Sequence, residues 1–234
     1  MRIAFLGDSL TEGSPGASFL RRLARLLPGD ELLNLGRAGD TVPSLLARLR
    51  AGGVPAADAA VVWIGTNDAF LGDWYLPPLD GDLAAWDTAP GLGPEEAALG
   101  HEEASGERRP DGAGAAGPAG YDAHRLRPVY DALLDLALAA APLVACVPPV
   151  LADPFAGEVA ERVAGIGAMV AAAAAARAPR TLVFDLAPAF AAAAGLAGGG
   201  FTIDGVHFSA RGADVVAAAV RDLVERLRER AAEA

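Results

Sequence analysis

The sequence predicts an α/β fold, in which a doubly wound, flavodoxin-like parallel sheet of about five strands is flanked by helices in a three-layer α/β/α arrangement. Short apolar runs of strand length alternate along the chain with segments whose apolar residues recur at helical spacing. The run 59–64 is apolar throughout, as expected of a central strand that helices cover on both faces. This alternation is typical of parallel sheets with right-handed crossovers.

The first part of the chain contains three predicted strands and two predicted helices. The strands cover 2–6, 31–35 and 59–64. Apolar residues recur at helical spacing over 19–27, and a Pro-Gly pair ends this first helix. After a glycine turn at 36–39, Thr41 is the expected N-cap of the second helix, with Pro43 in its first turn.

The last part of the chain resumes the alternation. Strands are predicted over 143–147 and 182–185, and helices over 158–177 and from Ser209, its N-cap, to about Arg230. A chain of 234 residues, of which 53% are hydrophobic, can bury a full core. We therefore expect a single domain over 1–234.

An insertion interrupts the pattern between about 77 and 120, where proline, glycine and acidic residues replace the hydrophobic period. It is either a partly disordered, solvated excursion or an ordered flap over the active site. Aromatic residues at its start and inside it favour some ordering near the site: Phe70, Trp74, Tyr75 and Trp86.

Composition excludes several classes of partner. The 19 basic residues are outnumbered by 30 acidic ones, which leaves a formal charge of -11 and argues against a nucleic-acid partner. The chain has no lysine, so it has no phosphate-binding loop that ends in Lys, and it has no Cys-His ligand cluster. We expect neither a metal nor a nucleotide, and hence no cofactor. The sequence does not set the oligomeric state.

The apolar segments point to a soluble protein. The run after Met1 is too short for a signal peptide, and the other apolar stretches are too short or too interrupted to span a bilayer. We therefore expect a cytoplasmic protein without stable membrane insertion. The single cysteine, Cys146, lies in an apolar run and is expected to be a buried, inert thiol.

Four short blocks of polar residues and glycines follow predicted strands or precede the last helix. They read GDSL at 7–10, NLGRAGD at 34–40, GTND at 65–68 and DGVH at 204–207. In this order they resemble the blocks of the GDSL esterase/lipase family, also called SGNH hydrolases. The Gly-x-Ser-x-Gly pattern of α/β-hydrolases does not fit, because Thr11 stands at its last position. The resemblance implies a serine hydrolase that cleaves carboxylic esters through an acyl-enzyme intermediate.

The residues themselves suggest a catalytic triad. The hydroxyl of Ser9 is a poor nucleophile unless a base takes its proton, and His207 is the candidate base. His101, in the acidic insertion, and His124 are more typical of solvated surface residues. Asp204 stands three residues before His207 and can bond its Nδ1, while Asp185, at the end of the fifth predicted strand, is the rival acid.

Acyl transfer also needs hydrogen-bond donors for the negative oxygen of the tetrahedral intermediate. By resemblance these donors are the backbone N–H groups of Ser9 and Gly39 and the side-chain amide of Asn67. Gly39 has no Cβ to block an approaching oxygen, and the amide of Asn67 stays a donor at every working pH. Gly36 is an alternative donor in the same block.

The other acidic residues in the blocks are expected to be structural. Asp8 should bond to local backbone, because a carboxylate beside the nucleophile would not help a developing oxyanion. Glu12 and Asp68 are expected to be structural or solvated. Asp40 is a candidate to cap the second helix together with Thr41.

Within this chemistry the four blocks do not identify the ester. The expected partner is a small-molecule ester substrate, and a carbohydrate or small-metabolite O-deacetylase would use the same mechanism. An alternative of a different class is a non-catalytic ligand-binding protein that keeps the fold and has lost turnover. Since every catalytic position holds the residue that the chemistry requires, the sequence favours the enzyme.

Overall fold

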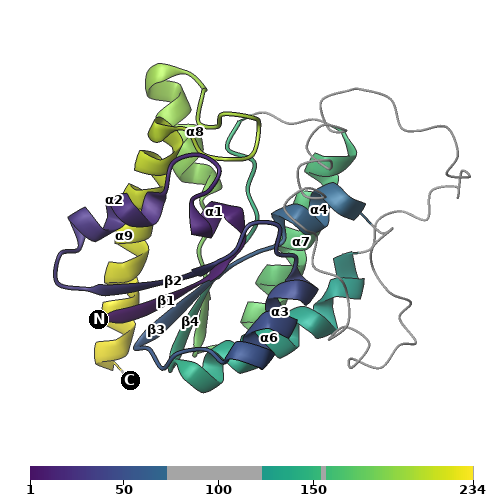
Figure 1. Cartoon of the computed structure of the whole chain (residues 1–234), viewed down its shortest axis with the longest axis vertical. Helices are drawn as coiled ribbons and strands as arrows, with labels where there is room; N and C mark the ends of the chain where they lie inside the picture. Colours follow the sequence, from purple (N-terminus) through teal and green to yellow (C-terminus); the bar gives the residue numbers. More distant parts are fainter. Residues whose placement is uncertain (73–122, 154–156, 234) are drawn as a thin grey trace, which may run out of the picture.

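The structure is a computed structural model that describes residues 1–72, 123–153 and 157–233. In these ranges five parallel strands form one sheet in the order β2-β1-β3-β4-β5 (Figure 1). They are β1 (Arg2–Gly7), β2 (Glu31–Gly36), β3 (Ala59–Trp63), β4 (Leu143–Val147) and β5 (Thr181–Val183). This is the strand order of flavodoxin-like sheets, so the predicted fold class is confirmed.

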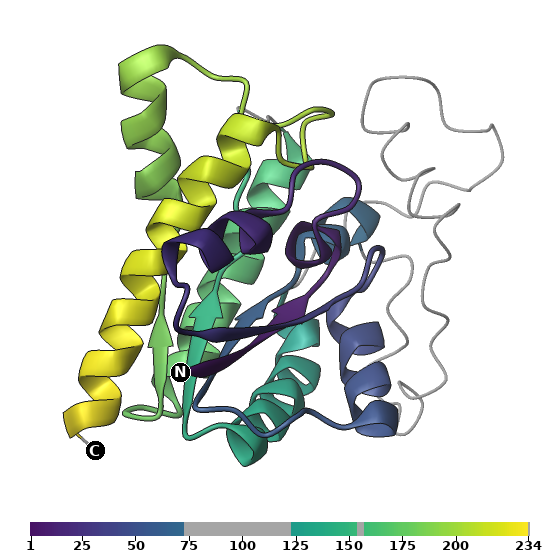
Figure 2. The ribbon, with the colours of Figure 1, turned by 60° about the vertical axis from the view of Figure 1, so that its left-hand side comes forward.

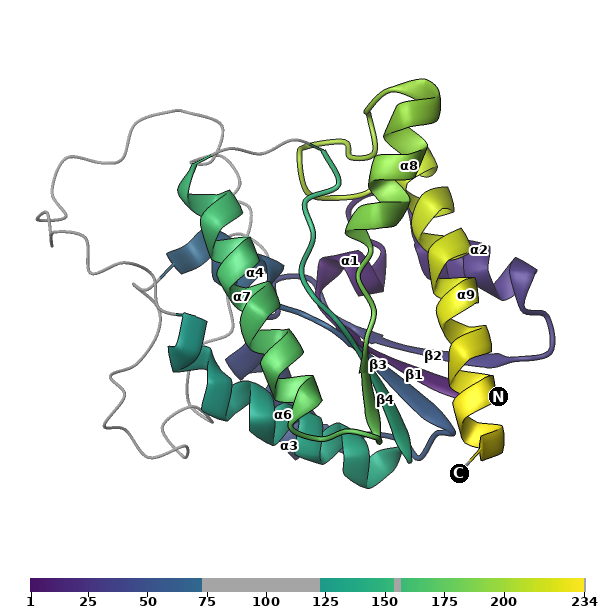
Figure 3. The same cartoon turned by 180° about the vertical axis from the view of Figure 1, so that it is seen from behind.

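Helices cover both faces of the sheet. One face packs against α2 (Phe19–Leu26), α8 (Ala187–Ala197) and α9 (Ala210–Glu233). The other face packs against α3 (Val42–Gly52), α6 (Arg127–Ala140) and α7 (Glu158–Ala175). Figures 2 and 3 show the two layers from different sides, with α8 beside the upper part of α9. The short elements α1 (Ser9–Glu12), α4 (Thr66–Leu71) and η3 (Ala123–Leu126) complete the described part.

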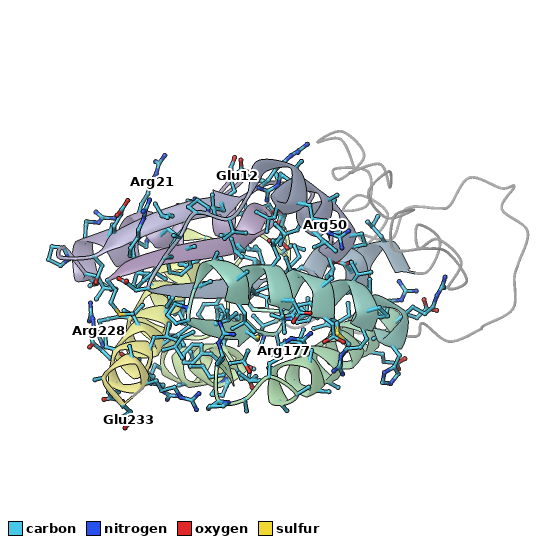
Figure 4. The ribbon with its side chains drawn as sticks, turned by 90° about the horizontal axis from the view of Figure 1, so that it is seen from below. Glu12, Arg21, Arg50, Arg177, Arg228 and Glu233 are labelled. Carbon is cyan, nitrogen blue, oxygen red and sulfur yellow. The ribbon has the colours of Figure 1, made fainter. Side chains whose placement is uncertain are left out.

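Strands β1 to β4 each contribute to two separate cores because successive side chains of a strand point to opposite faces. In β1, Ala4 and Leu6 pack with α3, α6 and α7, whereas Ile3 and Phe5 pack with α2 and α9. The central strand β3 is buried at every position, as its uniformly apolar sequence predicts. Many charged side chains lie on the surface, and Figure 4 shows Arg21 and Glu233 pointing away from the ribbon.

The helix caps predicted at Thr41 and Ser209 are confirmed. The side chain of Thr41 accepts a hydrogen bond from the N–H of Ser44, whose hydroxyl in turn accepts one from the N–H of Thr41, so α3 begins with a capping box. The hydroxyl of Ser209 accepts a hydrogen bond from the N–H of Gly212 at 3.2 Å, directly before α9. These caps fix where the two helices begin beside the carboxyl edge of the sheet.

Some element predictions need correction. The fifth strand was expected over 182–185 but covers Thr181–Val183, and Asp185 instead accepts a hydrogen bond from Ala187 N–H at the start of α8. Sequence periodicity missed α1 and α4, which have too few residues to display a helical period, and also α6 and α8. The insertion predicted at 77–120, with Trp74, Tyr75 and Trp86, lies outside the described residues, as does His101.

A close backbone contact joins the first and second blocks. Gly36 ends β2 at the point where α1 passes over it. A Cβ atom at Gly36 would lie 2.3 Å from the backbone N of Glu12 and 2.8 Å from the carbonyl oxygen of Asp8. Because these are backbone atoms that cannot rotate away, only glycine fits here.

We predict that Gly36→Ala destabilises the protein. The added methyl group should push α1 away from β2 and lower the free energy of unfolding by about 1–3 kcal/mol. Urea denaturation of the purified variant measures this value. Gly29→Ala is the matched control, since no atom lies within 4 Å of its Cβ position, and it should leave the stability nearly unchanged. Equal stability of the two variants would contradict the close contact.

Candidate active site

The predicted nucleophile, Ser9, is the first residue of α1, directly beyond the end of β1. The preceding Asp8 caps this helix, because its Oδ1 accepts a hydrogen bond from Leu10 N–H at 3.0 Å. Gly13 ends it with φ 82°, and the N–H of Gly13 bonds to the carbonyl oxygen of Ser9 at 2.8 Å. Only 5% of Ser9 is exposed. The hydrogen bonds of Asp8 and Gly13 at the two ends of this helical turn fix its position.

The predicted base, His207, ends a tight turn that begins at Asp204. The turn is closed by a bridge between Thr202 and Phe208 and by a hydrogen bond from Ile203 N–H to the carbonyl oxygen of His207 at 2.8 Å. Oδ1 of Asp204 accepts hydrogen bonds from two backbone N–H groups inside the turn, at 3.0 Å and 2.8 Å. The turn therefore holds the His207 ring, which is only 4% exposed.

The imidazole of His207 lies between the other two triad candidates. Its Nε2 is 3.0 Å from Oγ of Ser9, and its Nδ1 is 2.6 Å from Oδ2 of Asp204. Burial opposes ionisation of Asp204, but hydrogen bonds from the side chain and N–H of His207 and from Val206 N–H outweigh it and lower the pKa of Asp204. The rival acid Asp185 is exposed and bonds to the start of α8. Asp204 thus has the better geometry for orienting the ring.

The second block forms a loop that is fastened to the first. The N–H of Arg37 bonds to the carbonyl oxygen of Gly7 at 3.1 Å, and the N–H of Ala38 bonds to the carboxylate of Glu12 at 2.9 Å. Gly39 follows with φ 79°, a conformation that favours glycine. The alternative donor Gly36 already gives its N–H to Oδ1 of Asn34 at 3.0 Å, so Gly39 is the better candidate for the oxyanion.

Asn67 reaches the same loop from the third block. It is the second residue of α4 and is 6% exposed. Its Nδ2 donates one hydrogen bond to the carbonyl oxygen of Asp40 at 2.9 Å. Because a side-chain amide has two N–H hydrogens, this bond fixes the amide and leaves a second hydrogen for an oxyanion.

Three acidic residues support these loops, as expected of structural groups. Both oxygens of Asp68 accept from the N–H of Val42 at 3.1 Å, at the first residue of α3. Asp40 pairs with Arg48 at 2.6 Å, while Thr41, not Asp40, caps the helix. Glu12 accepts the hydrogen bond from Ala38 N–H in the second block. The contacts of Asp68 and Glu12 have no sequence signal, since their partners are 26 residues away.

Asp8 is a buried acid beside the nucleophile. Burial, and to a smaller extent the nearby carboxylates of Asp68 and Asp40, raise the pKa of Asp8 to about 7 against the lowering effect of Leu10 N–H. Within the described part of the chain its Oδ2 has no hydrogen-bond partner. The sequence predicted the local backbone bond of Asp8 but not its raised pKa, which depends mainly on burial and less on the two other acids.

Other candidates lie away from the triad. His124 is exposed in η3, and Cys146 is buried in β4, where burial raises the pKa of its thiol to about 12. Among the described residues, no three His, Cys, Asp or Glu side chains gather where they could hold a metal ion. None of the described helices combines the length and the apolar character that a membrane crossing needs.

Comparison with known proteins gives one family and many structures of the same fold. The profile of the GDSL-like Lipase/Acylhydrolase family matches residues 5–215. A structure from the lipolytic protein G-D-S-L family of Veillonella parvula is 15% identical, with a TM-score of 0.65 over 97% of this chain and 99% of that one. No curated protein matches the sequence.

Two further solved structures are similar. An acetylxylan esterase from Geobacillus stearothermophilus is 18% identical, with a TM-score of 0.62 over 94% of this chain and 91% of that one. A lipase/acylhydrolase from Enterococcus faecalis is 18% identical, with a TM-score of 0.56 over 99% of this chain and 96% of that one. At these identities the likeness concerns the fold.

We predict that Asp8→Asn changes how stability depends on pH. In the folded wild type Asp8 keeps its proton up to a pH of about 7, whereas an unfolded Asp releases it near 3.8. The free energy of unfolding of the wild type should therefore fall as the pH rises through this window, and the variant should lack this part of the fall. Urea denaturation at pH 5 and pH 8 measures the difference.

Asp222→Asn, on the exposed surface of α9, is the control for the loss of one carboxylate. It should keep the pH dependence of the wild type. If Asp8→Asn keeps it as well, Asp8 does not carry the proton that its burial implies.

Proposed function

The chain belongs to the GDSL-like lipase/acylhydrolase family, and from this premise we propose that Ser9, His207 and Asp204 are the catalytic triad with which it hydrolyses carboxylic esters. The observation that carries the proposal is the position of the His207 ring. Its two nitrogens lie 3.0 Å from the hydroxyl of Ser9 and 2.6 Å from the carboxylate of Asp204. These are hydrogen-bonding distances on both sides of a ring that can transfer a proton.

The proposed reaction has two steps. Oγ of Ser9 attacks the acyl carbon while Nε2 of His207 takes the hydroxyl proton, and His207 then gives this proton to the leaving alcohol. In the second step His207 takes a proton from water, and the resulting hydroxide attacks the acyl-enzyme. The acid leaves, and the proton returns to Oγ of Ser9. Asp204 accepts the hydrogen bond from Nδ1 and so favours the tautomer that presents a free Nε2.

We assign the oxyanion hole to the N–H groups of Ser9 and Gly39 and to the amide of Asn67. The hydrogen bond from Asn67 to the carbonyl oxygen of Asp40 supports this assignment, because it fixes the amide beside the loop that carries Gly39. Donors that are fixed before the charge develops stabilise it without reorganisation. The bond that Gly36 N–H makes with Asn34 supports Gly39 as the glycine donor.

A complete set of catalytic groups also distinguishes an enzyme from a ligand-binding protein on the same fold. Such a protein would not need a buried imidazole between a hydroxyl and a carboxylate. We propose that one hydrolase domain extends over 1–234, since both cores share the same sheet. The substrate is a small-molecule ester, and sugar O-acetyl esters belong in the first panel of compounds to be compared.

We predict that Ser9→Ala and His207→Ala each lower kcat for a short p-nitrophenyl ester by about 10⁴-fold or more. The first removes the nucleophile and the second removes its base. Initial-rate assays measure the loss, and circular dichroism checks that the fold persists. His124→Ala is the control because this exposed histidine lies in η3, and it should stay within about twofold of the wild type. Undiminished turnover in Ser9→Ala would end the proposed mechanism.

We also predict that Asn67→Ala lowers kcat by about 10²–10³-fold with little change in KM, because the amide acts on the transition state. The same assay separates the two constants. Thr66→Val is the matched control in the same helical turn, since the hydroxyl of Thr66 has no hydrogen-bond partner within the described residues. A rise in KM with an unchanged kcat would assign Asn67 to substrate binding instead.

A further inference from the structure

One carboxylate outside the four blocks binds the segment that leads into the His207 turn. Oδ1 of Asp153 accepts hydrogen bonds from the N–H groups of Gly200 at 2.9 Å and Phe201 at 3.2 Å. Its Oδ2 accepts from the N–H of Thr202 at 2.8 Å and also from the hydroxyl of Thr202. Three successive backbone N–H groups therefore converge on a single side chain.

The segment 200–202 forms one arm of the turn that carries the proposed base. Phe201 accepts a hydrogen bond from Ser209 N–H at 2.8 Å, and Thr202 forms the bridge with Phe208. Beyond these pairs the chain folds back from Asp204 to His207. Any shift of the arm is therefore passed to the imidazole ring.

The opposite arm has its own attachment. The carbonyl oxygen of Phe208 accepts a hydrogen bond from Ala17 N–H at 2.8 Å, which ties it to the segment after α1. The arm 200–202 begins with the last of three consecutive glycines at 198–200, whose backbone has a high conformational entropy. Ser209 and Arg211 bind the carbonyl oxygens of Gly200 and Gly199. Asp153 supplies the acceptors for the N–H groups of this arm.

We propose that Asp153 is a positioning residue that keeps His207 within proton-transfer distance of Ser9. The inference rests on the proposed triad and extends it to the loop after β4, where Asp153 lies. Catalytic groups must be held within about 0.5 Å of their productive geometry, and a displacement of about 1 Å can cost 10²-fold in rate. The four hydrogen bonds that Asp153 accepts from Gly200, Phe201 and Thr202, called the clamp below, meet this requirement from outside the four blocks.

The charge of Asp153 suits this role. Burial opposes its ionisation, but the hydrogen bonds from the side chain of Thr202 and from the three backbone N–H groups outweigh burial and lower the pKa of Asp153. Its stabilising contribution is thus fully present above the ordinary pKa of an Asp and is lost as the pH falls through the lowered value. The clamp is charged at neutral pH.

The test is Asp153→Asn, which keeps the shape of the side chain but replaces one acceptor oxygen by an NH2 group that faces N–H and O–H donors. We expect kcat for a short p-nitrophenyl ester to fall about 10–100-fold per folded molecule, well below the unfolding temperature, with KM within about threefold. Asp153→Glu retains the carboxylate and should recover part of this loss. A merely structural role would alter the folded fraction and leave kcat per folded molecule unchanged.

Asp185→Asn is the matched control. This aspartate also accepts a backbone N–H, from Ala187 at 2.8 Å, but it binds the start of α8 instead of the His207 turn. It should keep kcat within about twofold of the wild type. A kcat of Asp153→Asn within the same limit, or a rise in KM with unchanged kcat, would overturn the inference.

Thr202→Val keeps the proposal testable if Asp153→Asn does not fold, because it removes only the hydroxyl that binds Asp153. A kcat about 3–10-fold below that of the wild type would support the clamp, and an unchanged kcat would overturn it. Ser9→Ala, measured in parallel, distinguishes a failure of the proposed triad from a failure of the positioning role. If its turnover persists, the proposed triad fails; if it is inactive while Asp153→Asn is fully active, only the positioning role fails.

Discussion

The hydrogen bond between Nε2 of His207 and Oγ of Ser9 joins groups that are 198 residues apart in the chain, and the proposed chemistry depends on it. The parallel sheet makes this contact possible because all its strands end at the same edge. Ser9 follows β1, Gly39 follows β2 and Asn67 follows β3, while the His207 turn reaches the same edge just before α9. The fold thus brings four separated blocks together without a long-range covalent link.

Holding these groups in place requires buried carboxyl groups that are costly to ionise. The cost of burying Asp40 is offset by Arg48, that of Asp68 by the N–H of Val42, and that of Asp8 in part by the N–H of Leu10. Burial raises the pKa of Asp40 as well, although Arg48 and Ser44 act against this rise. Close packing of acids below a reaction centre is destabilising, and such costs are typical of functional sites. The two large cores on either side of the sheet offset them.

The sequence predicted the part of the fold that depends on periodicity and caps. The apolar run 59–64, the Thr41 cap and the Ser209 cap each depend on local residue types, and each is found where it was expected. The short helices α1 and α4 were missed because four and six residues are too few to display a helical period. The fifth strand was misplaced because its edge position leaves one face partly exposed.

For the candidate site, the sequence suggests which residues take part but not the contacts that position them. Ser9, His207 and Asp204 could be named because hydrolysis restricts the residue types and because only a few histidines exist. The contacts that position them could not be named, since Glu12 and Asp153 bind backbone N–H groups 26 and about 48 residues away. A carboxylate that binds backbone far away in the chain leaves no pattern in a single sequence. Only coordinates distinguish it from a solvated surface acid.

The most direct test of the proposed triad is to find which side chain reacts as the nucleophile. A fluorophosphonate probe reacts with an activated serine, and peptide mapping by mass spectrometry locates the adduct. The proposed triad predicts a single adduct on Ser9 in the wild type and a loss of labelling when His207 is replaced by alanine. An adduct at another residue, or no adduct on a folded wild-type protein, would contradict it.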